Sequence, residues 1–297
     1  MFTGRRAIVC GGLVVGLILS ASNVATAATA EVVRVTRLSR WRAPSPDPTG
    51  LSFDERTGRL LISDAEVDES VVWRRRNLYV SRRTGGLIAA RKLASITREP
   101  EDVAWNGRKH ILYVVDDDAK AVYAVRSGRD RILGTNDDTS RILLHTRRFG
   151  SRDPEGLAWR GDRKSLIVTD ASNCRVYVIG RGRDRRFDTP DDRVRSFGTA
   201  RFGFSETEDV WFDVPTKHLF IVSSRVPEGP DFAVETTYAG KLLRKIAFSV
   251  PIKASGVVMA PATDGTGRHL YVTDSGSPED VVPKENDGRL YEFAIVG

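Results

Sequence analysis

Three glutamates recur at one position of a repeated phrase, and their type and spacing point to ligand chemistry. Glu101, Glu155 and Glu208 each lie two residues before a short apolar run. Carboxylates that converge repel one another unless a cation or a neighbouring arginine offsets them. Hard oxygen ligands of this kind suit Ca²⁺. Two interpretations stay open: a cation-binding mouth, or a scaffold feature offset by Arg98 and Arg152, which lie just ahead of two of the glutamates.

The phrase that contains these glutamates occurs five times along the chain. It reads DPTGLSF, EPEDVAW, DPEGLAW, ETEDVWF and KASGVVM. Its fourth positions follow one another at spacings of 52, 54, 53 and 47 residues, and they are Gly50, Asp102, Gly156, Asp209 and Gly256. A repeat of this length, built from strands and turns alone, predicts an all-β β-propeller.

Each unit is expected to supply four strands, because β-branched and aromatic runs alternate with Gly, Asp and Lys turns. The first strands are predicted at Leu51–Phe53, Val103–Trp105, Leu157–Trp159, Val210–Phe212 and Val257–Met259. The second strands are predicted at Leu60–Ser63, Ile111–Val115, Leu166–Thr169, Leu219–Ser223 and Leu270–Thr273. A third strand is clear in four units, at Leu78–Val80, Val122–Val125, Val176–Ile179 and Leu290–Phe293. Weaker fourth strands are predicted at Leu87–Ala90, Ile142–His145, Val194–Phe197 and Leu242–Ala247.

The last unit ends at Gly297 after its third strand, so one strand is missing. The alternating stretch Glu31–Leu38 can supply it, which would close the ring and remove a free sheet edge. We therefore expect one propeller domain over residues 31–297, with five blades favoured. Six blades stay an alternative if the divergent stretch Val226–Tyr238 contains a short extra one.

The first 30 residues have the pattern of a signal peptide. Arg5 and Arg6 precede an apolar run, and small residues favour cleavage after Ala27 or Ala30. The run is too short to span a bilayer, so we expect a secreted or periplasmic protein with no stable membrane insertion. Cleavage after Ala30 leaves 267 residues with a formal charge of +5. It also leaves Cys174 as a lone cysteine, so no internal disulfide is expected.

A set of aspartates ends the second strands, on the face where the glutamates are expected. Its members are Asp64, Asp116, Asp170 and Asp274, with Ser224 near the equivalent place in the fourth unit. The following loops add Glu66, Asp68, Glu69, Asp117 and Asp118. The aspartates either contribute to ligand binding or cap turns by accepting backbone N–H groups, and the second alternative is favoured for them.

Two loops share the skeleton G-R-D-R-x-x-x-T-x-D-D and begin at Gly128 and Gly182. They lie between the third and fourth strands, away from the glutamates. Their carboxylates either wrap a structural Ca²⁺ or hold the hairpin through Asx-turns, and both alternatives stay open. The residues concerned are Asp130, Asp137 and Asp138 in the first loop, and Asp184, Asp188, Asp191 and Asp192 in the second.

Several reaction classes are disfavoured by placement. His110, His218 and His269 precede second strands on the face opposite the glutamates, and His145 lies at the rim, so a zinc cluster or a His acid/base pair is not expected. Basic runs are distributed over outer turns without a continuous track, which disfavours nucleic acid. The runs are Arg74–Arg76, Arg82–Arg83, Arg147–Arg148 and Arg181–Arg186. A small-molecule or cell-envelope ligand is the partner expected instead.

The phrases DPEGLAW and LIVTD, together with TGLSFD and LLISD, resemble the SdiA-regulated propellers. They are also similar to the wider NHL, SMP-30 and phytase-like group of exported propellers. Enzymes of that group place Ca²⁺ at the tunnel mouth and hydrolyse esters, lactones or phosphate esters, and the resemblance would assign this role to Glu101, Glu155 and Glu208. Two functions remain: an exported binding or scaffold propeller with an acidic, Ca²⁺-binding mouth, or a Ca²⁺-dependent hydrolase.

Overall fold

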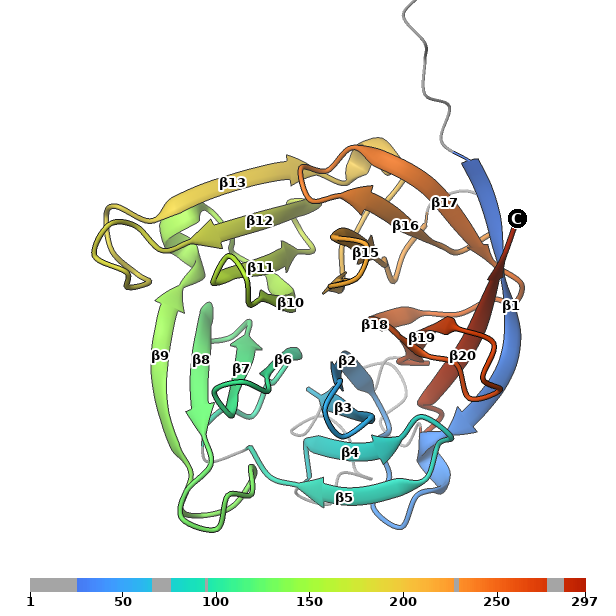
Figure 1. The fold of residues 1–297 in the computed structure, drawn as a ribbon, viewed down its shortest axis with the longest axis horizontal. Coiled ribbons are helices and arrows are strands. Elements are labelled where there is room, and N and C mark those ends of the chain that lie inside the picture. The colour runs from blue at the N-terminus through green and yellow to red at the C-terminus, as the bar shows by residue number, and fades with distance from the viewer. Residues whose placement is uncertain (1–25, 66–75, 94–95, 227–229, 277–285) are drawn as a thin grey trace, which may run out of the picture.

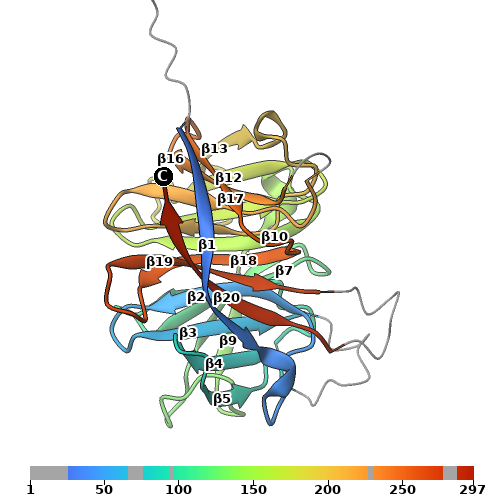
Figure 2. The same ribbon diagram turned by 90° about the vertical axis from the view of Figure 1, so that its right-hand side faces the viewer.

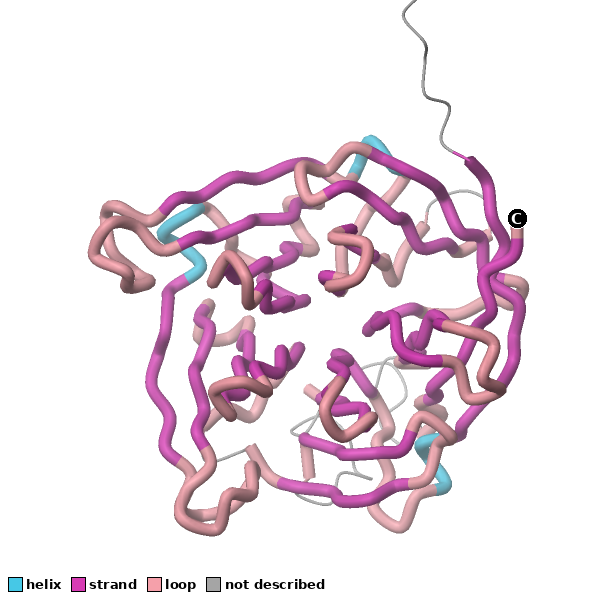
Figure 3. Tube along the Cα trace, in the orientation of Figure 1, coloured by secondary structure: helices cyan, strands magenta, loops and turns pink. Residues whose placement is uncertain are grey.

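The computed structural model describes residues 26–65, 76–93, 96–226, 230–276 and 286–297. In this part of the chain, sheets of largely antiparallel strands stand around a central axis (Figure 1). Strands and connecting loops make up nearly all of the trace (Figure 3). The predicted loop acids Glu66, Asp68 and Glu69 lie outside the described residues.

Three of the sheets have four strands each. The first consists of β2 (Pro48–Asp54), β3 (Arg59–Asp64), β4 (Leu78–Arg82) and β5 (Leu87–Arg91). The second consists of β6 (Asp102–Asn106), β7 (Ile111–Asp116), β8 (Ala121–Arg126) and β9 (Thr139–His145). The third consists of β10 (Pro154–Arg160), β11 (Ser165–Asp170), β12 (Arg175–Gly180) and β13 (Arg193–Gly198).

The fourth sheet has eight strands, because the N-terminal strand joins two four-stranded groups. One group consists of β14 (Val210–Phe212), β15 (His218–Ile221), β16 (Phe232–Thr237) and β17 (Leu242–Phe248). The other consists of β18 (Ala254–Pro261), β19 (Arg268–Asp274), β20 (Arg289–Val296) and β1 (Thr26–Arg37). Strand β1 pairs antiparallel with β20 and parallel with β17. It runs beside β20 along the outer wall (Figure 2).

The predicted closure by an N-terminal strand is confirmed, with a longer strand than expected. Residues Thr29–Arg37 pair with β20, and Thr26–Ala30 add a parallel ladder to β17. Ala30 is fully buried beneath that ladder. The prediction began at Glu31 because Thr26–Ala30 had been assigned to the signal peptide. Leu38, predicted as strand, instead opens the 3₁₀ helix η1 (Leu38–Arg40).

The core consists of apolar clusters between consecutive sheets. Leu157 and Val168 of the third sheet pack with Val115 and Val122 of the second, and equivalent clusters follow around the ring. Large side chains of the first strands contribute to these clusters, and Phe53 and Phe212 are buried in them. Both faces of the inner strands are covered, which explains why these strands are buried along most of their length.

The third strand of the fourth unit was not predicted, and it is β16. The described residues of the stretch Val226–Tyr238 supply this strand to the sheet of β14 and β15. Two further 3₁₀ helices, η2 (Thr146–Phe149) and η3 (Ala200–Phe202), lie at the rim (Figure 3). Within the described ranges, no helix is long and apolar enough to cross a membrane.

Candidate functional site

The three repeated glutamates line one pocket of about 510 Å³ at an end of the central axis. Glu101, Glu155 and Glu208 reach it from the starts of β6, β10 and β14. Asp117 and Asp118, from the loop after β7, also line it. These five carboxylates therefore lie around one pocket, and ligand binding by them stays a prediction. We call this pocket the acidic mouth.

Main-chain hydrogen bonds hold the glutamates at the mouth. The N–H groups of Glu101 and Glu208 donate to the carbonyls of Val115 and Val222, in each case at 3.1 Å. The carbonyl of Glu101 accepts from Ser63 Oγ of the neighbouring sheet at 3.0 Å. Glu155 lies in a bulge of β10, where pairing with β11 shifts register between Pro154 and Leu157. Bulges re-aim side chains, and this one directs Glu155 toward the axis.

Crowding and burial disfavour the charged forms of two of these glutamates. The pKa of Glu155 is raised well above its usual range by burial and then by the charge of Glu208, and its side chain is hydrogen-bonded to Glu101. Burial raises the pKa of Glu208 to about 7, although a hydrogen bond from Ser224 and the charge of Lys253 oppose the rise. A bound cation would offset the same repulsion, so the mouth favours proton or cation uptake.

Ser224, which was expected near this face, lines the mouth together with Glu206 and Arg225, which the repeat pattern did not assign to it. Ser224 Oγ donates to Glu208 Oε1 at 2.5 Å and to Glu206 Oε2 at 3.0 Å. Arg225 forms an ion pair with Glu206 at 2.9 Å. The cations that line the pocket are Arg225 and Lys253, whereas the expected pair, Arg98 and Arg152, does not line it. A signal for Ser224 existed, because it replaces the aspartate that ends the second strand in other units.

The aspartates at the ends of the second strands do not line the acidic mouth. Asp170 accepts the N–H groups of Arg152, Asp153 and Asn173. Asp116 accepts that of Ala119. The contacts are similar at the other two members of the set, where the N–H of Asp47 donates to Asp64 and that of Lys253 donates to Asp274. These contacts support the turn-capping alternative, and ligand binding by this set stays a prediction.

Two fourth positions of the repeat, Asp102 and Asp209, form a buried pair beneath the acidic mouth, which we call the plug. Asp102 and Asp209 are both fully buried and hydrogen-bonded to each other, so one of them must be protonated. Burial and the charge of Asp209 raise the pKa of Asp102 well above its usual range, and burial raises that of Asp209 to about 7. The repeat spacing identified these positions in the sequence, but it predicted neither their burial nor their contact.

The plug also ties the sheets together through main-chain donors. Asp102 accepts the N–H of Val103 at 2.6 Å and that of Leu157, in the next sheet, at 2.6 Å. Asp209 repeats this arrangement with Val210 at 2.5 Å and Val257 at 2.6 Å. The fourth positions that are not aspartate are glycines, because the neighbouring unit approaches their Cα atoms too closely to leave room for a Cβ. A Cβ at Gly50 would lie 2.2 Å from Asp102 Oδ1.

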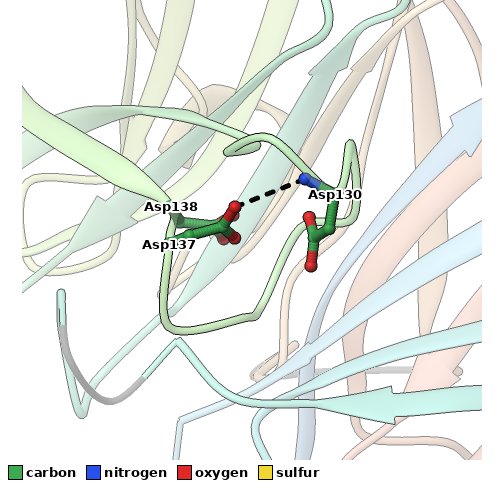
Figure 4. Close-up of side chains that lie close together, drawn as sticks. All are labelled: Asp130, Asp137 and Asp138. Atoms are coloured by element: carbon green, nitrogen blue, oxygen red, sulfur yellow. Dashed lines mark hydrogen bonds between the residues drawn. The ribbon is translucent and has the colours of Figure 1, made fainter.

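Carboxylates of the first Gly-Arg-Asp loop converge at the periphery of the other face. One oxygen from each of Asp130, Asp137 and Asp138 lies within 4.8 Å of the others, and these three are the metal-ligand group that the described residues form (Figure 4). Asp137 Oδ2 already accepts from the N–H groups of Arg129 at 2.6 Å and Asp130 at 3.3 Å. The donor set fits a hard cation, and the same oxygens also serve the Asx-turns of the hairpin.

The second loop has the same internal bonds without the convergence. Asp191 Oδ2 accepts from the N–H groups of Arg183 and Asp184, and Asp192 Oδ2 accepts from that of Asp188. The Asp188 side chain is turned toward His145 Nδ1, at 2.8 Å. The two loops are therefore alike in backbone, but of the two only the first gathers three carboxylates.

The histidines and the cysteine take structural partners away from the mouth. His218 Nδ1 lies 2.6 Å from Glu235 and His269 Nδ1 lies 2.9 Å from Glu292. Burial raises the pKa of the Cys174 thiol, which opposes thiolate formation. Among the described residues that line the acidic mouth there is no histidine or cysteine, so the acid/base groups that they offer are carboxyls and the amine of Lys253.

No family model and no curated protein sequence matches this chain. Solved structures do match it in fold. A luciferin-regenerating enzyme aligns over 91% of this chain and 95% of its own, with a TM-score of 0.52 and 12% identity. A glutaminyl cyclase from Myxococcus xanthus aligns over 92% and 98%, with a TM-score of 0.52 and 11% identity.

The PQQ-bound aldose sugar dehydrogenase from Streptomyces coelicolor aligns over 90% of this chain and 98% of its own, with a TM-score of 0.51 and 12% identity. At such low identity these likenesses show the fold alone. The chain is an all-β protein of β-propeller architecture whose N- and C-terminal strands pair in one sheet.

Proposed function

We propose that this protein is a binding propeller whose acidic mouth takes up a cation, with Ca²⁺ as the first candidate. The observation that carries the proposal is the convergence of Glu101, Glu155 and Glu208 in one pocket of about 510 Å³. Two of these carboxyls, Glu155 and Glu208, have pKa values raised first by burial and then by the charge of neighbouring carboxylates. A cation replaces the bound protons and offsets the repulsion at once.

The geometry also constrains how a cation would be held. The three glutamates do not form a group whose ligand oxygens all lie within 4.8 Å, as the first Gly-Arg-Asp loop does. A cation shared by all three is therefore held partly through water, which Ca²⁺ tolerates because its coordination is flexible. A cationic organic ligand would meet the same carboxylates from the solvent side of the pocket.

Calorimetric titration with Ca²⁺ tests the proposal. The experiment uses an Asp137→Asn background, which disables the loop site, and compares it with the same background carrying Glu155→Gln. Binding at pH 8 is expected to be lost with Glu155→Gln and retained with Glu55→Gln, an exposed carboxylate at the other end of the axis. Binding should weaken as pH falls through about 7, because Glu208 becomes protonated. Equal binding with and without Glu155 would refute the proposal.

A second function, ester or phosphate-ester hydrolysis, is favoured by one contact. Ser224 Oγ lies 2.5 Å from Glu208, whose pKa of about 7 suits a general base at neutral pH. In this alternative Glu208 takes the proton of Ser224 or of a water molecule. A panel of chromogenic ester, lactone and phosphate substrates, with and without Ca²⁺, decides between the two. Turnover that Ser224→Ala and Glu208→Gln both abolish would establish catalysis over binding alone.

We propose five blades for the ring. The supporting observations are the three four-stranded sheets, the division of the eight-stranded sheet at the parallel β17–β1 pairing, and the five inter-sheet core clusters. The resemblance to SdiA-regulated and phytase-like propellers remains part of this proposal. An experimental structure with a sixth group of strands in the ring would contradict it.

We also propose export, with cleavage after Ala27 rather than Ala30. The support is structural, because cleavage after Ala30 would remove all the residues that pair with β17 (Thr26–Ala30), including the buried Ala28 and Ala30, whereas cleavage after Ala27 keeps the last three. Intact-mass measurement of the protein recovered from culture supernatant or periplasm gives the answer. A product that begins at Glu31, or one that keeps Met1, would contradict this site.

A further inference from the structure

The end of the axis opposite the acidic mouth carries a cleft lined by cations. It lies between the second and third sheets and encloses about 720 Å³. Its walls come from the ends of β8 and β10, the start of β9, and the turns that lead into β7, β11 and β13. We call it the basic cleft, and its eight cationic residues are Arg108, Lys109, Arg126, Arg141, Lys164, Arg181, Arg185 and Arg186.

The eight cations have no acidic neighbour in the lining of the cleft, as far as the described residues form it. Within the described part of the chain, none of the eight cations makes an ion pair within 4.0 Å, whereas Arg160 on the adjoining turn is paired with Asp162 at 2.9 Å. Seven of the eight are exposed, and Arg181 is half-buried. Like charges gathered in a concave site raise the local potential and attract anions.

The fold builds this cleft by tying a loop across it. The second Gly-Arg-Asp loop contributes Arg185 and Arg186, and Arg181 precedes it. Its Asp188 side chain lies 2.8 Å from His145 Nδ1 of β9, and Arg148 donates to the Asp188 carbonyl at 2.8 Å. Asp188 belongs to a loop of the third sheet, whereas His145 and Arg148 lie at the end of the second sheet. These contacts therefore hold the outer wall of the cleft against the second sheet.

Two further contacts order the guanidinium of Arg181. Its Nη1 donates to the carbonyl of Arg185 at 3.0 Å, and its Cζ lies 5.8 Å from the ring centroid of Phe187. Tyr113 and Trp159 also line the cleft, with their ring centroids 4.9 Å apart. Arginines and aromatic rings are therefore interleaved here, which the distribution of basic runs in the sequence did not reveal.

We propose that the basic cleft binds a small ligand that carries a chain of phosphate groups. The volume matches sites for small molecules. Guanidinium groups bind phosphate oxygens in bidentate fashion, and six of the eight cations are arginines. Eight uncompensated charges require a multivalent anion rather than a single phosphate. This site lies at the other end of the axis from the acidic mouth, so it does not depend on the function proposed there.

The test is calorimetric titration of the full chain with inorganic tripolyphosphate at 150 mM salt. We expect one saturable site, and binding of orthophosphate that is at least about tenfold weaker. The variant Arg141→Gln with Lys164→Gln should weaken tripolyphosphate binding about tenfold or more. The matched control, Arg37→Gln with Arg147→Gln, removes the same charge from exposed positions outside the cleft and should change binding less than about twofold.

Raising the salt concentration should weaken the interaction, because exposed charges are screened. Melting temperatures confirm that both double variants are folded, and Lys164→Gln alone replaces the first if it is not. Equal losses in the two double variants would mean that net charge attracts the anion, and would overturn the proposal. Absence of saturable binding at 150 mM salt, or equal affinity for orthophosphate, would overturn it as well.

Discussion

The buried carboxyl pair at the centre of the ring makes stability depend on pH in an unusual direction. In the folded protein Asp102 keeps a proton that it shares with Asp209 and that the unfolded chain releases near its ordinary pKa of 3.8. The folded state therefore binds more protons than the unfolded state above this pH. It follows that the free energy of unfolding decreases as pH rises toward the folded-state pKa.

The substitution Asp102→Asn separates two contributions of this side chain. The amide has one acceptor oxygen, so the N–H of Val103 or of Leu157 loses its partner, which costs about 1–3 kcal/mol at any pH. The amide cannot ionise, so the variant avoids the proton penalty of Asp102. That penalty grows by about 1.4 kcal/mol per pH unit for as long as Asp102 keeps its proton, hence by at most roughly 3 kcal/mol between pH 5 and pH 7.

Urea unfolding at pH 5, 6, 7 and 8 measures the difference between variant and wild type. The variant is expected to be less stable by about 1–3 kcal/mol at pH 5, and the gap should close or reverse by pH 7 to 8. Glu155 and Glu208 shift stability in the same direction, but they are common to both proteins and cancel in the difference. Glu55→Gln provides the control. Parallel pH profiles of the variant and wild type would refute a shared buried proton.

Three further outcomes are expected. Gly156→Ala places a Cβ 2.5 Å from main-chain atoms at the start of β14, so it should destabilise by about 1–3 kcal/mol or more in urea unfolding, and an unchanged midpoint would contradict the close approach. In a Glu155→Gln background, which removes the proposed site at the mouth, Ca²⁺ bound by the first Gly-Arg-Asp loop predicts that a chelator lowers the melting temperature of the parent and of Asp191→Asn but not of Asp137→Asn; identical responses would exclude this loop. A chain without Thr26–Ala30 loses the β17 ladder and should melt at lower temperature than one that begins at Thr26, and equal melting would show that the ladder contributes nothing.

The sequence alone determined the β-propeller architecture, because a propeller consists of one local strand-and-turn pattern that recurs at a nearly fixed spacing. In each unit, β-branched runs indicate the strands, and Gly, Asp and Lys indicate the turns. The spacing of Gly50, Asp102 and their equivalents gives the length of the repeat. The face shared by Glu101, Glu155 and Glu208 followed from antiparallel pairing, since equivalent positions of a repeat meet at the same end of the axis. The closing strand was predictable because the last unit lacks a fourth strand and the alternating N-terminal stretch can supply it.

Only the tertiary structure decided the burial, the neighbours and the pKa values of the carboxylates near the axis. Asp102 accepts the N–H of Val103 in its own strand and also meets Asp209 across the axis, and the second contact depends on the ring diameter, which no local pattern encodes. Burial then turns two ordinary aspartates into a proton-sharing pair, because ionising both in a dry interior is too costly. In the same way Arg141 and Arg181 come from separate sheets, and only the packing of one sheet against the next gathers them into the basic cleft. Charge and pKa depend on distances through space, and those are set by the closed ring.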